Sequence, residues 1–403
     1  MGAQMNRKRE SFDVAVVGAG LNGLVAAKAF AVAGFSVASL GALERGGPGR
    51  TVALFGRSIA LLQRLGVWPR IEASAAPLRT LRIVDDTGSL FAPGPVEFAS
   101  SDIGLDAFGW NVENAELAEI VAESLLGESQ ARRSGVRVER LGWEADRVTA
   151  ISEGAIVAAK LLVGADGRGS PTRKAVGVTA RVHAYRQSAL TVRLAHSRPH
   201  DDASTEFHTR EGPFTLVPLP PKDGAANRSS LVWLMSESEG RRRAALDDRA
   251  LAREIEKQSR GLVGSIELVG GRALFPMAAQ CASRLIAKRV ALVGDAAHVF
   301  PPIGAQGLNL GLRDVEDLVA AAERARDLGR DIGETAPLRD YERARGPDIA
   351  VRMIAVNGLN LSLLSAFAPV DALRGAGLAA LAAIGPLRRM AMREGLSPQW
   401  ARR

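Results

Sequence analysis

The sequence has little of what disulfides, metal centres and membrane spans require. It has one cysteine, Cys281, so it cannot form an internal disulfide or a cysteine-rich metal site. Its five histidines are scattered without the paired spacings that bind zinc, and we expect no metal. No apolar run reaches the roughly 20 residues of a membrane-spanning helix. The first residues lack the long apolar stretch of a signal peptide, so we expect a cytoplasmic protein.

Acidic residues are fewer than basic ones, 44 against 52, which gives a net charge of +8. Such an excess favours nucleic acid, anionic lipid or an acidic cofactor as a partner. The chain has two tyrosines and no zinc-finger or RNA-binding signature, so we expect no nucleic acid partner. The partners left open are a phosphate-bearing cofactor and a membrane surface, the second of which would place the protein peripherally on the inner membrane.

A glycine-rich motif follows the first strand-like run of the chain. Residues 12–17 are apolar and typical of a buried parallel strand, and residues 21–33 have the pattern of a helix. Between them lies Gly18-x-Gly20-x-x-Gly23. Gly18 permits a tight turn, Gly20 lets a pyrophosphate approach the backbone, and Gly23 lets helix and strand pack closely. In this context the motif predicts dinucleotide binding at the positive end of the helix.

One part of the dinucleotide pattern is missing. The end of the second strand, where an acid would bind the ribose hydroxyls, carries Gly41 in "SVASLGALERGG". Glu44, three residues further on, would substitute if the loop curls back. The alternative is that the ribose hydroxyls bond to the backbone or to water, at a cost of about 1–3 kcal/mol for a lost charge-assisted bond.

Two further motifs each follow a strand-like run. The first is "GADGRGSPTRK", with Asp166 and Gly167, and the second is "GDAAHVFPPIGAQGLNLG", with Asp295. Together with the first glycine motif, and in this order, they resemble the group A flavoprotein monooxygenases of the para-hydroxybenzoate hydroxylase type. The resemblance implies FAD as the bound cofactor and NAD(P)H as a transient reductant. A single GxGxxG agrees with this, since a separate NAD(P)H domain would bring a second one.

The resemblance also implies which residues bind FAD. The glycine motif would hold the diphosphate, Asp166 and Gly167 the pyrophosphate region, and Asp295 the ribityl chain. Arg50 corresponds to an arginine near the flavin ring, with a solvated loop arginine as the alternative, and His298 is expected to be structural. The turn around the flavin ring would consist of Pro302, Gly304, Gly307, Leu308 and Asn309.

The order of the patterns predicts an α/β fold: a Rossmann-like FAD-binding domain with an inserted antiparallel β-sheet substrate domain and a C-terminal helical tail. A strand is expected at 136–140 and a helix at 56–68. The expected parts are a basic tail (1–10), a discontinuous FAD-binding domain (11–78, 104–184 and 272–345), a substrate-binding β-sheet domain (79–103 and 185–271) and a C-terminal helical segment (346–403).

Within group A, the chain is similar to the ubiquinone-biosynthesis hydroxylases from residue 12 to about residue 396, with "GAQGLNLGLRD" as the most typical stretch. The resemblance implies ring hydroxylation of a polyprenylated phenol, in which NAD(P)H reduces FAD, O2 forms the flavin C4a-hydroperoxide, and its distal oxygen attacks the ring. An apolar substrate wall is expected, unless its members are ordinary sheet-core residues: Phe207, Phe214, Leu216 and Trp233. No catalytic base is evident, and His208 is the weak candidate.

Two other functions remain open at this point. One is a group A hydroxylase or epoxidase of another aromatic substrate, and the other is a flavin-poor scaffold subunit of a quinone-synthesis assembly, favoured only by Gly41. The apolar C-terminal stretch 361–387 could lie on a bilayer, dock on partners in a quinone-synthesis complex, or pack on the FAD-binding domain.

Overall fold

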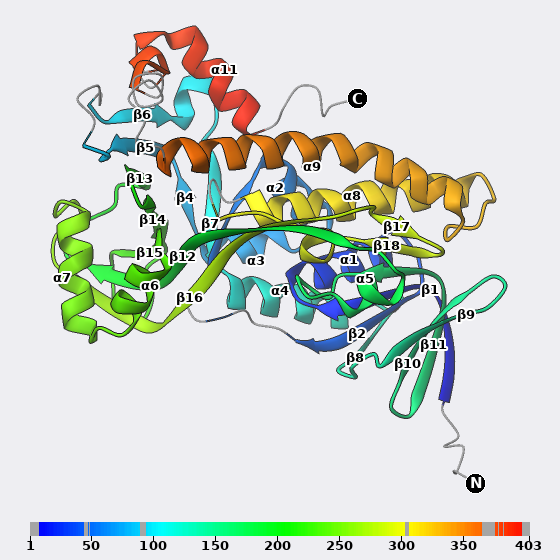
Figure 1. Ribbon diagram of the computed structural model, residues 1–403. Helices are drawn as coiled ribbons and strands as arrows, with labels where there is room; N and C mark the ends of the chain where they lie inside the picture. The colour runs from blue at the N-terminus through cyan, green and yellow to red at the C-terminus, as the bar shows by residue number, and fades with distance from the viewer. Residues whose placement is uncertain are drawn as a thin grey trace.

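The computed structural model describes residues 8–43, 47, 49–88, 94–302, 306–364, 375–377, 379–381 and 383–396. Two eight-stranded sheets and one three-stranded sheet form its framework, with helices packed around them (Figure 1). The arrangement confirms the predicted α/β fold with an inserted, largely antiparallel sheet and C-terminal helices.

The first sheet has the strand order β17-β18-β11-β1-β2-β8, with β10 and β9 added along β11. Strands β18, β11, β1, β2 and β8 run parallel to one another. The middle strands are apolar without alternation because helices and loops cover both faces. The strands are β1 (Lys8–Ala19), β2 (Val37–Leu43), β8 (Ala131–Ser134), β9 (Arg140–Trp143), β10 (Val148–Ser152), β11 (Ala155–Gly164), β17 (Ile286–Ala287) and β18 (Val290–Leu292).

The parallel strands bring three distant parts of the chain to one edge. β1 and β11 are neighbours, with Val17 opposite Gly164, and β11 and β18 are neighbours, with Gly164 opposite Leu292. The carboxyl ends of these strands therefore lie side by side, at the edge where open α/β sheets bind ligands. Helices α1 (Leu21–Val32), α4 (Asn114–Leu126) and α8 (Gln306–Asp327) share the apolar core of this sheet.

The second sheet has the order β19-β16-β12-β15-β14-β13-β5-β6 and is antiparallel except for the pair β13 and β5. Helices α6 (Glu237–Ala244) and α7 (Asp248–Gln258) pack against this sheet, and α7 shares a separate apolar core with it. The strands are β5 (Thr80–Asp85), β6 (Val96–Ala99), β12 (Ala180–His196), β13 (Ala203–Thr209), β14 (Gly212–Leu219), β15 (Arg228–Ser236), β16 (Ile266–Ala282) and β19 (His298–Val299).

The small third sheet joins the two large ones, and the long helix α9 (Thr335–Leu364) runs beside α8 towards β5 and β6 (Figure 1). Met392 of α11 (Gly385–Leu396) packs with Phe98 and Phe108 at the end of the second sheet. The remaining elements are β3 (Thr51–Phe55), β4 (Ala75–Leu78), β7 (Gly109–Glu113), α2 (Gly56–Arg64), α3 (Trp68–Glu72), α5 (Pro171–Ala175) and the 3-10 turns η1 (Ser100–Ile103) and η2 (Gly294–Ala296).

Three expectations about local structure were wrong. β1 begins at Lys8, inside the expected basic tail, because residues from Lys8 onward pair with β11. The strand expected at 136–140 is absent, and β8 and β9 flank that segment. The helix expected at 56–68 breaks at Gly66, whose φ of +71° ends it. In addition, α9 contains Pro347, whose exposed position lets water bond the carbonyl left without a donor.

Among the helices of the described residues, none has the length and apolar character needed to cross a bilayer.

Candidate functional site

The turn between β1 and α1 has glycines where the neighbouring backbone lies too close for a side chain. Gly18 has a φ of +112°, and a Cβ placed on it would lie 2.3 Å from the carbonyl oxygen of Ala165. A Cβ on Gly23 would lie 1.8 Å from the carbonyl oxygen of Gly18. Gly20 precedes the helix in an extended conformation, and no acidic side chain stands in the first helical turn. The free N–H groups and positive end of α1 therefore offer a site for a phosphate.

At position 41, where the acid is missing, the backbone conformation also favours glycine. Gly41 has a φ of +132°, in the region that side chains rarely adopt, and a Cβ there would lie 3.2 Å from the amide nitrogen of Ala19. The pairing of β1 with β2 shifts register between Val17 and Ala19, next to this position. An acid at residue 41 would therefore strain the glycine turn itself. Glu44, the expected substitute, lies outside the described residues.

The Asp166–Gly167 loop follows β11 directly. The Asp166 carboxylate accepts hydrogen bonds from the Ser170 hydroxyl and, at 2.7 Å, from the amide of Thr172. Arg173 is 5% exposed, and its guanidinium donates to the carbonyl of Ala296 at 2.7 Å. This arginine therefore ties the Asp166 loop to the turn that holds Asp295. The sequence motif contained Arg173, but nothing in its spacing revealed this contact.

The turn after β18 presents the second predicted acid. Gly294 has a φ of +58°, and the half-buried Asp295 follows it. No hydrogen bond or ion pair to the Asp295 carboxylate exists among the described residues, so it is free to accept hydroxyl donors. Asn22 fills the space beside the turn: a Cβ on Gly294 would lie 2.1 Å from its Nδ2, and one on Gly311 2.3 Å from its Oδ1.

A buried charge cluster lies directly behind this turn. The Asp314 carboxylate, fully buried, accepts from the amide of Gly294 at 2.9 Å, from His298 Nε2 at 2.6 Å and from Arg345 Nε at 2.7 Å. Burial alone would raise the pKa of Asp314, but His298 and Arg345 outweigh it and lower this pKa. His298 thus has a structural partner, as expected. Asp314 and Arg345 are functional neighbours that sequence reasoning missed.

The start of α8 was predicted to surround the flavin ring. Asn309 accepts from the amide of Phe55 at 3.1 Å and from Ser58 Oγ at 2.7 Å, and it donates to the carbonyl of Ala53 at 2.8 Å. Its side chain is therefore used to fix α8 against β3 and α2. Because α8 begins at residue 306, the N–H groups of its first residues, 306–308, have no intrahelical acceptor and face the side from which a ligand would approach the helix.

The other predicted residues near the ring lie as follows. Pro302 is exposed, Gly307 and Leu308 are half-buried in the first turn of α8, and Gly304 lies outside the described residues. Arg50 is exposed, and its guanidinium carbon lies 5.3 Å from the ring centroid of Phe275 on β16. The loop that carries Arg50 therefore meets the second sheet.

The predicted apolar wall is wrong in its choice of face. Phe207, Phe214, Leu216 and Trp233 form one core with residues of α7, and Arg243 of α6 lies 4.1 Å from the Trp233 ring. These side chains alternate with a second set on the opposite face, and alternation alone did not tell which face turns toward the first sheet. The four residues are therefore sheet core beneath α6 and α7.

The opposite face meets β3 and β7 through Ser230, whose hydroxyl accepts from Thr51 Oγ1 at 2.8 Å. It carries the buried His208 and the half-buried Glu206, joined through Nε2 and Oε1 at 2.8 Å. His208 is 4% exposed, and its Nδ1 has no hydrogen-bond partner, as is true of Thr191 Oγ1. The single base candidate from the sequence thus lies on the sheet face opposite α6 and α7, the face that meets β3.

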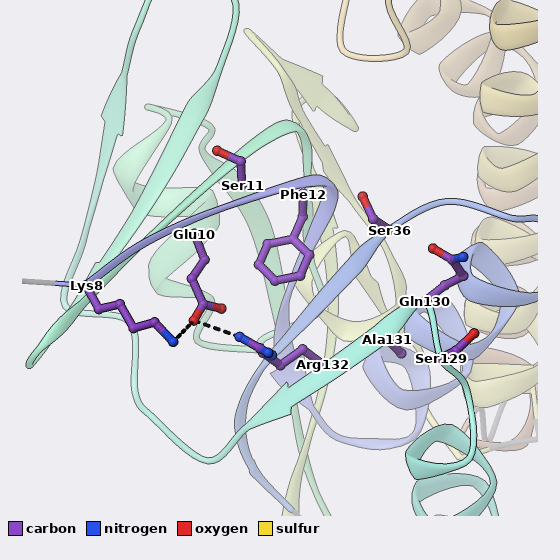
Figure 2. A pocket seen from close by; sticks show the side chains of 9 residues that line it. All are labelled: Lys8, Glu10, Ser11, Phe12, Ser36, Ser129, Gln130, Ala131 and Arg132. Carbon is purple, nitrogen blue, oxygen red and sulfur yellow. Dashed lines mark ion pairs between the residues drawn. The ribbon is translucent and has the colours of Figure 1, made fainter.

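An open hollow of about 600 Å³ lies elsewhere, at the amino-terminal end of β1 (Figure 2). Figure 2 shows Lys8 and Arg132 turned toward Glu10, with ion pairs of 2.8 and 2.7 Å. The hollow lies at the edge opposite the glycine turns and its charges are paired internally. It is distinct from the cofactor edge, by which we mean the carboxyl ends of β1, β11 and β18 and the turns that follow them.

The fit of the cofactor edge to FAD rests on its hydrogen-bond donors, its unpaired carboxylate and the space left by its glycines. One end offers glycine backbone and a helix N-terminus for phosphate, and the other offers an unpaired carboxylate for hydroxyls and a second helix N-terminus. These groups match the diphosphate, ribityl chain and electron-poor ring of FAD. They define the class of FAD-dependent monooxygenases in which one cofactor spans both ends of the chain.

Comparisons with known proteins agree. The chain belongs to the FAD binding domain family, which matches residues 11–325. It is 33% identical to ubiquinone hydroxylase UbiL of Rhodospirillum rubrum over 393 residues, covering 95% of this chain and 89% of the relative. It is 27% identical to the 3-demethoxyubiquinol 3-hydroxylase of Escherichia coli, covering 95% and 98%. The crystal structure of p-nitrophenol 4-monooxygenase PnpA from Pseudomonas putida has the same fold, with a TM-score of 0.77 at 19% identity over 97% and 99% of the chains.

Proposed function

We propose that the protein hydroxylates the aromatic ring of a polyprenylated phenol in ubiquinone biosynthesis, with FAD bound, NAD(P)H as reductant and O2 as oxidant. The observation that carries the proposal is the likeness, over 95% of the chain, to a relative named a ubiquinone hydroxylase. The open Asp295 carboxylate and the glycine turn support it, since a flavin-poor scaffold would have no use for either. The division into an FAD-binding part and a substrate sheet belongs to the same proposal.

FAD, when bound, supplies the electron transfer and oxygen activation. The chain's own residues would hold it: the α1 N-terminus would bind the diphosphate, Asp295 would accept the ribityl hydroxyls, and the N–H groups of 306–308 would stabilise negative charge on the ring system. Arg173 and Asp314 hold the two loops from behind. Glu44 and Gly304 keep their proposed parts in binding the ribose and the ring.

The phenol proton needs an acceptor, and His208 is the proposed base. Glu206 accepts from His208 Nε2, so the proton-free nitrogen is Nδ1, the atom without a partner. A phenol hydroxyl at hydrogen-bond distance from Nδ1 would transfer its proton there, which makes the ring more electron-rich. The carboxylate would then stabilise the charged imidazole.

The test is turnover by the FAD-loaded protein of a phenol with a short prenyl tail. We expect NAD(P)H oxidation coupled to a hydroxylated product whose new oxygen comes from labelled O2. Asp295→Asn should lose flavin and product together. Product from simple phenols but from no prenylated phenol would move the substrate to another aromatic class, and absence of flavin binding would favour the scaffold.

A further inference from the structure

The long helix α9 has exposed charges in its first turns, at Arg339, Asp340 and Arg343, but from Arg345 onward its charged side chains are turned inward. Arg345, Asp348 and Arg352 are the charged residues between positions 345 and 364, and they are 1%, 2% and 9% exposed. Further along, Asn357 accepts from the Tyr185 hydroxyl, and Asn360, fully buried, donates to Gln187 Oε1 at 3.1 Å. The helix therefore uses its polar groups to attach itself to α8 and the second sheet.

From Pro347 onward, the outward side of the same helix is apolar. Val351, Ile354 and Leu361 are 50%, 73% and 58% exposed, and alanine and glycine lie between them. Their spacing of three and seven residues places them on one stripe, about 15 Å long. Among the described residues from 347 to 361, no exposed side chain is charged. A surface helix with this inverted pattern has an apolar partner to bury against.

The stripe continues in the last described part of the chain. Ile384 and Met390 are 50% and 58% exposed, next to the exposed Arg389. Figure 1 shows α11 beyond the end of α9 that lies near β5 and β6, where Arg388 pairs with Asp102 at 3.4 Å. Two separate elements thus present apolar side chains, and the exposed Arg389 lies beside those of the second.

The charge of the C-terminal region indicates what covers this surface. Residues 349–403 contain seven arginines and two acids, Asp371 and Glu394; Arg352 is buried against Asp348 and Arg388 pairs with Asp102, which leaves Arg389 exposed on the described surface. We propose that the stripe of Val351, Ile354 and Leu361, together with Ile384 and Met390, docks on a bilayer that contains anionic lipids. Apolar side chains enter the acyl boundary and Arg389 meets the phosphates. The choice of a bilayer rests on the proposed function, because a polyprenylated phenol resides there.

The test measures binding of the FAD-loaded protein to sedimented vesicles. Vesicles of phosphatidylcholine with phosphatidylglycerol are compared with vesicles of phosphatidylcholine alone. We expect binding to the first that falls with salt, and a loss of about tenfold in partition for each of Ile354→Gln and Leu361→Gln. The matched control is Leu126→Gln, which changes an equally bulky side chain, 66% exposed, on α4 away from α9 (Figure 1). The control should bind as the wild type does.

Equal binding by the stripe variants and the control would overturn the proposal, as would no binding to anionic vesicles at all. A dimer in solution that Ile354→Gln converts to monomer would show instead that the stripe is a contact between copies. Turnover of a short-tailed phenol in solution is measured on the same samples. If it fails while the vesicle result holds, the proposed reaction is wrong and the docking surface remains.

Discussion

Replacing Asp314 by asparagine should weaken FAD binding although the side chain lies behind the turn and cannot reach the cofactor edge. The carboxylate accepts three donors, the amide of Gly294, His298 Nε2 and Arg345 Nε, at 2.9, 2.6 and 2.7 Å. An amide of the same shape offers one acceptor atom. The Nδ2 group of the asparagine would therefore face either the Arg345 guanidinium or the amide of Gly294, and both of these are donors.

The magnitude follows from this conflict. Breaking a buried ion pair costs about 3–5 kcal/mol, and Arg345 keeps Asp348 at 2.8 Å, so we expect the lower value, about 3 kcal/mol. For a chain of this size that corresponds to a melting temperature lower by roughly 3–4 °C. Loosening of the turn that aims Asp295 should weaken FAD binding about tenfold to a hundredfold, the worth of one charge-assisted hydrogen bond.

The assay separates positioning from simple loss of stability. FAD dissociation constants are measured by flavin fluorescence well below both melting temperatures, for wild type, Asp314→Asn and Asp331→Asn. The control Asp331 pairs with Arg289 at 2.8 Å, at the far end of β18 from the turn. It should cost some stability and leave FAD affinity unchanged. If Asp314→Asn lowers the melting temperature but binds FAD within about twofold of wild type, the positioning argument is refuted.

Three other outcomes can be checked. Gly41→Glu restores the acid of the dinucleotide pattern, yet its φ of +132° should make FAD binding weaker, and tighter binding in a titration would contradict the strain argument. His208→Gln should lower ring hydroxylation about a hundredfold and change its pH profile while FAD affinity stays constant. Burial would raise the pKa of Asp348, but Arg345 and its neighbours lower it to about 2. Because the folded pKa lies below the unfolded one, about 2 kcal/mol of stability should be lost as pH falls from about 4 to 2, and Asp348→Asn should flatten that slope in a melting series.

The glycine turns could be predicted from sequence because their requirement is local. Gly18 and Gly23 are needed where a side chain would strike the backbone of the same turn or the next strand, and such positions recur with fixed spacing. Asp295 was also predictable, since it follows a strand at the ligand edge of a parallel sheet. The fold class followed from the same run of strands and helices.

Other features depend on contacts between distant residues. Alternation in β13 and β14 showed two faces, but only the packing of Trp233 beneath Arg243 shows that Phe207 and Phe214 turn away from the cofactor edge. Arg173 reaches a carbonyl 123 residues further on, a contact that no spacing rule contains. Likewise, Asp314 looks like an ordinary surface acid of an amphipathic helix until α9 covers it.

The inward position of the charged side chains on α9 accounts for the apolar character of its outer stripe. Arg345 and Asp348 face inward because the Asp314 cluster needs a countercharge behind the Gly294 turn, and that leaves only apolar side chains for the outer stripe. Cofactor binding and bilayer docking are therefore carried by opposite faces of one helix and should respond to different substitutions. Ile354→Gln should leave FAD affinity untouched while it weakens vesicle binding, and Asp314→Asn should do the reverse. A variant on either face that changed both would mean that α9 moves as a unit between the cofactor and the membrane.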